Sequence, residues 1–183
     1  VEKSTAFYQF KIKDNLLRTL KSISDKENVD IFYVFLAMYI FMLAEISNNQ
    51  KVCLQASIDS EVEVQLNLDL SGIDDFSALI KLVVNEYSRS KKDNSYLLKD
   101  IGKARLNRNQ SSVVPIFIRS SDTGLSNLGL HNVFDIIMEM REEADLIDFT
   151  CEFNSNRLNK DKIKDLVNNY VGLIETITEN YGI

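Results

Sequence analysis

This 183-residue sequence contains one histidine and two cysteines, so imidazole and thiol groups for nucleophilic, general-base or metal-ligand chemistry are few. The single histidine is His131, and an imidazole can act as a general base near neutral pH. Asp135 follows four residues later, but in a strand this separation puts two side chains on the same side at a long distance. We therefore predict that His131 is a surface or strand-edge residue, with a catalytic base as the alternative.

The two cysteines, Cys53 and Cys151, each lie within an apolar run and have no second cysteine nearby in the sequence. This spacing predicts neither a disulfide framework nor a zinc site, so both thiols are expected to be small buried side chains. No Gly-x-Ser-x-Gly elbow and no glycine-rich phosphate loop occurs. The residues alone therefore predict no catalytic centre and no metal site.

Acidic side chains gather at two places in the sequence. Asp74 and Asp75 precede a helical pattern, where carboxylates interact favourably with the helix dipole, so capping is the expected role. A second group lies around a predicted hairpin turn that has no glycine, which argues against a calcium loop and for a solvated hairpin tip. Its members are Glu139, Glu142, Glu143 and Asp145.

One stretch of the chain is basic although the chain as a whole is acidic. Lys and Arg number 21 against 27 Asp and Glu, so the net charge is −6, which argues against general nucleic-acid binding. The stretch could attract an acidic partner or a phosphate group, or it could be a solvated face. Its residues are Arg89, Lys91, Lys92, Lys99, Lys103, Arg105 and Arg108.

The elements that would position these residues alternate between strand and helix periodicity, which predicts one α/β domain over residues 1–183 with a mixed, mostly antiparallel sheet packed by helices. The apolar run 31–46 is about sixteen residues long, too short to span a bilayer, and no signal peptide is evident, so a cytoplasmic protein is expected. The expected strands are 6–12, 52–58, 62–70, 113–118 and the hairpin 134–140 with 147–153. Helices are expected after the capping residues Asp14, Asp30, Asp74 with Asp75, and Asn159, and a short helix over 96–101, with a polar connector at 87–95.

Several segments resemble the carboxy-terminal half of a condensation domain from nonribosomal peptide synthetases. The strongest similarity is at 134–177, where a strand beginning Phe134-Asp135-Ile136 precedes an acidic hairpin and a strand ending in Phe153-Asn154, followed by a helix. The helix with Leu36-Ala37 and the strand with Pro115-Ile116-Phe117 are similar to further family segments. The similarity covers nearly the whole chain, in motifs that mainly carry the fold.

This resemblance implies a half-domain like chloramphenicol acetyltransferase that pairs with an amino-terminal half. Peptidyl carrier proteins would deliver thioester substrates on phosphopantetheine arms for amide-bond formation in antibiotic biosynthesis, a ligase-type reaction. Within the chain, Ser57, Asp59 and Asn67 would line the substrate tunnel. The acidic carriers would dock on the basic residues Arg89, Lys91, Lys92, Arg105 and Arg108.

The chain departs from the family at two points, and these leave its activity open. The catalytic His-His-x-x-x-Asp-Gly signature belongs to the other half and is absent here, so no catalytic residue carries over. The family's Gly-x-Phe-x-Asn segment is also missing, and a shortened segment at 61–70 stands in its place. Two alternatives therefore remain: a non-catalytic scaffold that binds carriers or synthase partners, and an independent acyltransferase that uses His131.

Overall fold

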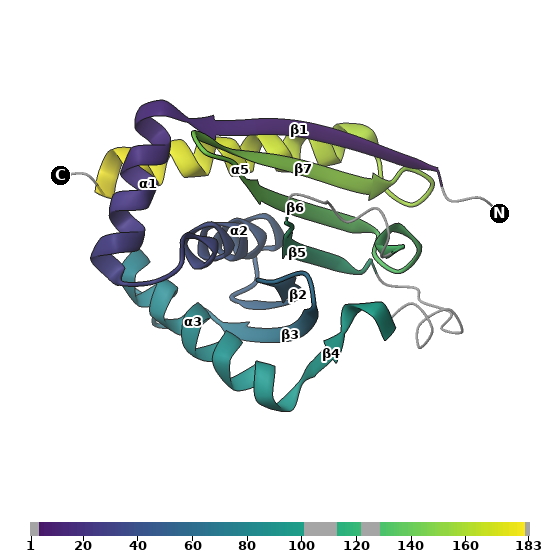
Figure 1. Ribbon diagram of the computed structural model, residues 1–183, viewed down its shortest axis with the longest axis horizontal. Helices are drawn as coiled ribbons and strands as arrows, with labels where there is room; N and C mark the ends of the chain where they lie inside the picture. Colours follow the sequence, from purple (N-terminus) through teal and green to yellow (C-terminus); the bar gives the residue numbers. More distant parts are fainter. Residues whose placement is uncertain (1–3, 101–112, 122–128, 182–183) are drawn as a thin grey trace.

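The structure, a computed structural model, describes residues 4–100, 113–121 and 129–181. Its strands form one seven-stranded sheet in the order β1-β7-β6-β5-β2-β3-β4 (Figure 1). The elements in chain order are β1 (Thr5–Lys13), α1 (Asp14–Glu27), α2 (Ile31–Ser47), β2 (Lys51–Ser57), β3 (Val62–Asp69), α3 (Phe76–Asp93), β4 (Ser95–Leu97), β5 (Pro115–Arg119), the 3-10 helix η1 (Leu130–Asn132), β6 (Ile136–Glu142), β7 (Leu146–Asn154) and α5 (Lys160–Tyr181).

The sheet is mixed and mostly antiparallel, as the sequence predicts. β5 pairs in parallel with β2 and with β6, and the remaining neighbours pair antiparallel. The predicted hairpin is confirmed as β6 and β7, and the predicted strand 52–58 is the interior strand β2, next to the central strand β5. The carboxyl ends of the three parallel strands therefore meet at one edge of the sheet.

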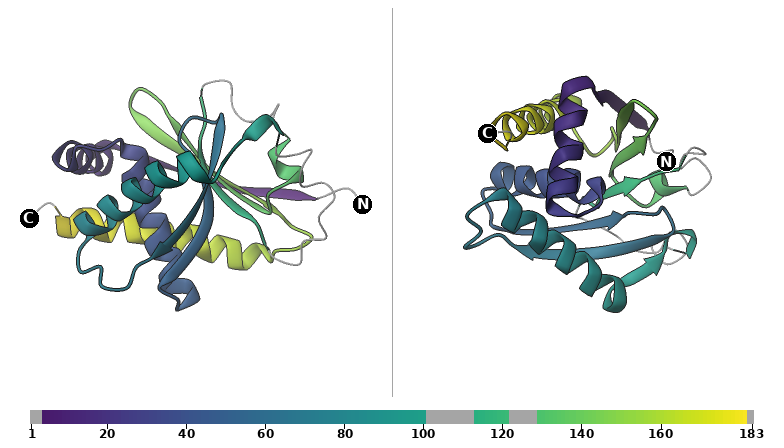
Figure 2. Two further views of the ribbon diagram at one scale, coloured as in Figure 1. Left: turned by 90° about the horizontal axis from the view of Figure 1, so that it is seen from below. Right: turned by 60° about the vertical axis from the view of Figure 1, so that its left-hand side comes forward.

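Helices pack on one face of this sheet (Figures 1 and 2). α2 is buried almost all round because α1, α3 and α5 surround it while the sheet lies beneath it. Aromatic rings bridge the layers: Phe149 of β7 lies 5.0 Å from Phe35 of α2, and the Tyr170 hydroxyl of α5 donates to the Phe35 carbonyl at 2.8 Å. A separate small apolar cluster on the other face packs η1 and the residues after it against β5 and β6.

Within the described ranges, α1, α2, α3 and α5 lie on one face of the sheet, and this corrects one prediction. Along β2 the side chains of Val52, Leu54 and Ala56 are buried among the helices, whereas Cys53 points to the other face and is exposed. Successive side chains of a strand alternate between faces, so an apolar run does not bury both. Cys151, on the helix-covered face of β7, is buried as predicted.

Helix beginnings follow the predicted caps at three of four places. Carboxylate or amide oxygens of Asp30, Asp75 and Asn159 accept backbone N–H bonds at 2.9, 2.7 and 2.8 Å and so cap α2, α3 and α5. The cap predicted at Asp14 is wrong. β1 runs directly into α1, so the extended residue Lys13 occupies the cap position without a side-chain bond, and Asp14 is already the first residue of α1.

The polar connector predicted at 87–95 is also wrong, because α3 continues to Asp93. Tyr87 and Ser90 are buried and extend the apolar stripe that begins at Leu79, so tertiary burial outweighs the polar composition. Tyr96, predicted in a helix, lies in β4; residues 98–100 are helical.

No single helix among the described residues is long and apolar enough to cross a membrane. α1 and α2 together meet the length and composition test, but they are bent by 103° at the break between them.

Candidate functional site

Polar side chains concentrate where the parallel strands β2, β5 and β6 end. Ser57 is the last residue of β2, Arg119 the last of β5 and Glu142 the last of β6, while Asp59 and Ser60 lie in the turn that follows β2. We call these five residues the strand-end cluster. Ligands of open α/β sheets bind at the carboxyl ends of parallel strands, which makes this edge the first candidate site.

Asp59 organises the tight turn between β2 and β3. Its Oδ1 atom accepts the backbone N–H groups of Glu61 and Val62 at 2.9 and 3.0 Å, and the Ser57 hydroxyl lies 3.4 Å from the same atom. Partial burial raises the pKa of Asp59, but these N–H donors and the ammonium of Lys91 outweigh burial and hold the pKa below its usual value. Asp59 is therefore stabilised as a carboxylate.

Arg119 ties three elements to this turn. Its guanidinium binds both carboxylate oxygens of Asp30 at 2.7 and 3.0 Å, and it lies 3.1 Å from Glu142. Its Nε donates to the Ile58 carbonyl at 2.9 Å, and the Ser60 hydroxyl donates to the Arg119 carbonyl. The planar guanidinium suits this forked arrangement, so the turn is held rigidly against α2 and β6.

The lowered pKa of Asp59 predicts how stability depends on pH. A carboxylate whose folded pKa lies below its unfolded value, about 3.9, contributes stability above that value and loses it as the pH falls through the folded pKa. We expect the difference in free energy of unfolding between wild type and Asp59→Asn to be constant from about pH 5 to 7 and to shrink below about pH 4. Denaturant unfolding at each pH measures it, and a difference that grows in acid would contradict the prediction.

The three predicted tunnel residues do not form one group. Ser57 and Asp59 are adjacent, but Ser57 is fully buried and is held within the turn by the Ser60 backbone N–H, which donates to its hydroxyl at 3.1 Å. Asn67 lies on β3, on the exposed face of the sheet, where its side chain accepts from the Cys53 thiol at 3.0 Å. Cys53 precedes Ser57 by four residues on the same strand, which places Asn67 roughly 13 Å from Ser57.

His131 and Asp135 lie in different environments. His131 is exposed in η1, whereas Asp135 is buried and bound to other groups. The Asp135 carboxylate accepts from Arg157 at 2.8 Å, from the Val114 backbone N–H at 3.1 Å and from the Asn154 side chain at 3.4 Å. The Phe134-Asp135 and Phe153-Asn154 motifs of the sequence thus meet in space as a fold-bearing network.

The described part of the basic stretch lies at the end of α3 and beyond it. Arg89, Lys91 and Lys92 are exposed in the last turns of α3; Arg89 pairs with Glu86 at 2.6 Å, and Lys91 lies 3.9 Å from Asp59. The following edge strand β4 exposes Tyr96 and Leu97. Lys103, Arg105 and Arg108 lie outside the described residues.

The acidic residues of the β6–β7 hairpin are divided between two settings. Glu143 and Asp145 are exposed at the tip, as predicted, and Glu142 is exposed while it binds Arg119. Glu139 is instead half-buried on the sheet and accepts from the Ser120 hydroxyl at 2.6 Å. Among the described residues, no group of three or more His, Cys, Asp or Glu is arranged to hold a metal ion.

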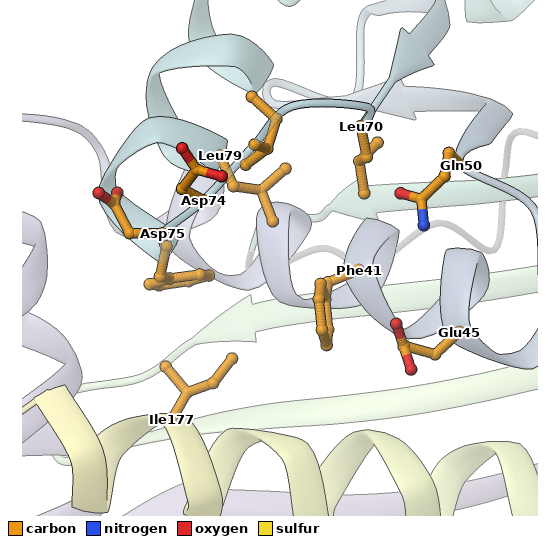
Figure 3. A pocket seen from close by; sticks show the side chains of 10 residues that line it. Phe41, Glu45, Gln50, Leu70, Asp74, Asp75, Leu79 and Ile177 are labelled. Carbon is orange, nitrogen blue, oxygen red and sulfur yellow. The ribbon is translucent and has the colours of Figure 1, made fainter.

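A pocket of about 360 Å³ lies elsewhere, between α2, α5 and the start of α3 (Figure 3). The sequence patterns did not predict this pocket. The signal was present in Phe41 and Glu45, which are four residues apart and hence share one face of the helix. The lining residues are Phe41, Glu45, Gln50, Leu70, Ile73, Asp74, Asp75, Phe76, Leu79 and Ile177.

Comparison with known proteins identifies the fold. No family model and no curated protein matches the sequence. One similar structure is an X-domain from teicoplanin biosynthesis in complex with OxyB. The alignment covers 98% of this chain and 47% of the other chain, with a TM-score of 0.76 and 10% sequence identity. A second is the EpoB cyclization-docking bidomain of a peptide synthetase from Sorangium cellulosum, for which the alignment covers 96% of this chain and 42% of the other (TM-score 0.75, 13% identity). A third is a condensation domain that mediates chain release from the enacyloxin polyketide synthase, for which the alignment covers 96% of this chain and 41% of the other (TM-score 0.71, 12% identity).

The chain therefore has the fold of one half of a condensation-type domain and spans less than half the length of each of these structures. It resembles such a half in its mixed seven-stranded sheet and in the helices that pack on it. At identities of 10–13%, the likeness concerns the fold.

Proposed function

We propose that this chain is the carboxy-terminal half of a condensation domain and acts in amide-bond formation together with an amino-terminal half. The observation that carries the proposal is that nearly all of the chain matches less than half of condensation-type structures. In the reaction, an amine attacks a thioester carbonyl, a C–N bond forms, the C–S bond breaks, and the proton of the amine passes to the departing thiol. The reactive histidine would come from the partner half.

Within this proposal the strand-end cluster and Asn67 form part of the substrate-tunnel wall. Two features support this role. The cluster lies at the carboxyl ends of parallel strands, and the bonds of Arg119 and Asp59 give it a fixed shape. Asp59 and Asn67 present the exposed polar atoms, whereas Ser57 supports the turn from within.

Carrier proteins would dock at the end of α3 and bring phosphopantetheine-tethered substrates to the tunnel. The exposed cations there are followed in the chain by the exposed apolar side chains of Tyr96 and Leu97, a combination suited to a partner with an acidic surface and an apolar contact. The basic residues proposed for this role are Arg89, Lys91 and Lys92, together with Arg105 and Arg108.

Complementation tests the pairing. We expect the purified chain to form a complex with a matching amino-terminal half and to yield amide product from two loaded carriers, whereas neither half alone does so. The matched control is an amino-terminal half whose second signature histidine is replaced by alanine, which should bind this chain and give no product. Turnover by this chain alone would contradict the proposal, as would failure of the two halves to bind.

Charge reversal tests the docking surface. We expect Lys91→Glu with Lys92→Glu to weaken carrier binding about tenfold, because both cations are exposed on the proposed docking surface. The loss of affinity should be larger at low salt than at high salt. Arg105→Glu with Arg108→Glu tests the rest of the stretch in the same way. Lys162→Glu with Lys164→Glu on α5 changes the net charge equally at a distant place and should leave the affinity unchanged. Equal affinities for all these variants would reject the surface.

A second candidate, a scaffold that binds carriers without chemistry, is favoured by the short turn at residues 58–61, which closes β2 and β3 into a hairpin. It predicts carrier binding with no amide product from the paired halves. The third, an acyltransferase that uses His131, predicts loss of turnover in His131→Ala; the bonds of Asp135 to Arg157 and Val114 weigh against it.

A further inference from the structure

The pocket between α2, α3 and α5 lies apart from the proposed docking surface. The docking surface is at the carboxyl end of α3 and the pocket is at its amino end, so the length of an 18-residue helix, about 27 Å, separates them. The pocket and the proposed docking surface are therefore separate parts of the molecule.

The floor of the pocket is apolar. Phe41 of α2, Leu79 of α3 and Ile177 of α5 converge on it from three helices, and Leu70 closes it from the end of the β-hairpin (Figure 3). Phe41 is 36% exposed, unusual for a large ring on a helix whose other side chains are mostly buried. A volume of about 360 Å³ suits a small organic molecule.

The rim of the pocket carries one sign of charge. Among the described residues that line it there are three carboxylates and no lysine, arginine or histidine. In Figure 3, Phe41 and Glu45 lie side by side on α2, and Asp74 lies across the pocket from them. Asp75 is engaged as the cap of α3, whereas Glu45 and Asp74 are exposed. Lys26 of α1 lies over the Tyr181 ring at 4.8 Å.

We propose that this pocket binds a small apolar molecule that carries an ammonium group. The apolar body would contact Leu70, Leu79 and Ile177, while the ammonium would lie against the face of Phe41 and beside Glu45, with Asp74 adding negative charge from across the pocket. Aromatic faces and carboxylates both attract a cation, and Glu45 and Phe41 present both from adjacent turns of one helix. An anion of the same shape would be repelled by the rim.

The test uses 2-phenylethylammonium, with 3-phenylpropanoate as a probe of similar shape and opposite charge. Each is titrated into the protein while methyl resonances of Ile177, Leu70 and Leu79 are followed by NMR. We expect the ammonium to bind with saturable shifts at these methyl groups and the carboxylate probe to bind at least tenfold more weakly. Salt should weaken the binding of the ammonium.

Variants locate the interaction. Glu45→Gln with Asp74→Asn should raise the dissociation constant of the ammonium at least fivefold and leave the cap at Asp75 intact. Asp145→Asn with Asp165→Asn alters the net charge equally, at exposed positions outside the pocket lining, and should change nothing.

Three outcomes would overturn the proposal: equal binding of both probes, shifts confined to other methyl groups, or no saturable shift at 10 mM probe in the folded protein. Concentration-dependent shifts of the pocket methyl groups without probe, with dimers in sedimentation, would also overturn it, because the occupant would then be a second copy of the chain.

Discussion

Replacement of Asp135 by alanine is expected to lower the free energy of unfolding by about 3–5 kcal/mol. The Asp135 side chain is 3% exposed and accepts from Arg157, Val114 and Asn154, so alanine removes three contacts at once. It also leaves the Val114 N–H, which leads into β5, without its acceptor. Urea unfolding followed by circular dichroism measures the change, and the midpoint of thermal unfolding should fall by roughly 10 °C.

Two further variants separate the charge of Asp135 from its size. Asp135→Asn keeps one acceptor oxygen but loses the ionic bond to Arg157, so about half of the loss is expected. Asp145→Ala, at the exposed hairpin tip, should change the free energy by less than about 0.5 kcal/mol. A loss below about 1 kcal/mol in Asp135→Ala would show that the network does not hold β5, β6 and β7 together.

Replacement of Arg119 by methionine is expected to lower the free energy of unfolding by about 2 kcal/mol and to loosen the turn after β2. The loss is smaller than for Asp135 because the Arg119 side chain is 24% exposed and its acidic partners more so, which weakens each ion pair through solvent screening. The Ile58 carbonyl and the Asp30 carboxylate both lose a donor. Hydrogen exchange at Ser60 and Glu61 should quicken more than exchange in β7.

Two variants at Asp30 test whether its charge or its helix cap contributes more to the free energy of unfolding. Asn is as good a helix cap as Asp, so Asp30→Asn keeps the bond to the Phe32 N–H and removes the ion pair with Arg119. Asp30→Ala removes both the cap and the ion pair, and it should lower the free energy of unfolding by about 1 kcal/mol more than Asp30→Asn does. Arg119→Lys should recover little stability, because an ammonium cannot bind Asp30 in bidentate fashion. Unchanged exchange at Ser60 in Arg119→Met would contradict the anchoring role.

The amino-acid sequence determined the elements whose periodicity is strong. The alternation along residues 62–70, 134–140 and 147–153 predicted three strands, and the apolar stripe after Asn159 predicted the last helix, because burial of one face demands these periods. Asp30 and Asp75 marked helix beginnings for the same local reason, since their oxygens satisfy otherwise unpaired N–H groups. These elements, with the quoted motifs, were enough for the fold.

Tertiary structure decided what local patterns leave undetermined. Tyr87 extends α3 through a polar segment because its hydroxyl accepts the Ile58 N–H at 3.0 Å, a contact across 29 residues. Arg119 meets Asp30 across 89 residues, and the acidic pocket joins Phe41 of α2, Asp74 of the segment before α3 and Ile177 of α5. Such groupings depend on how layers pack, and the free energy that creates them comes from contacts between distant segments, which no window of the sequence contains.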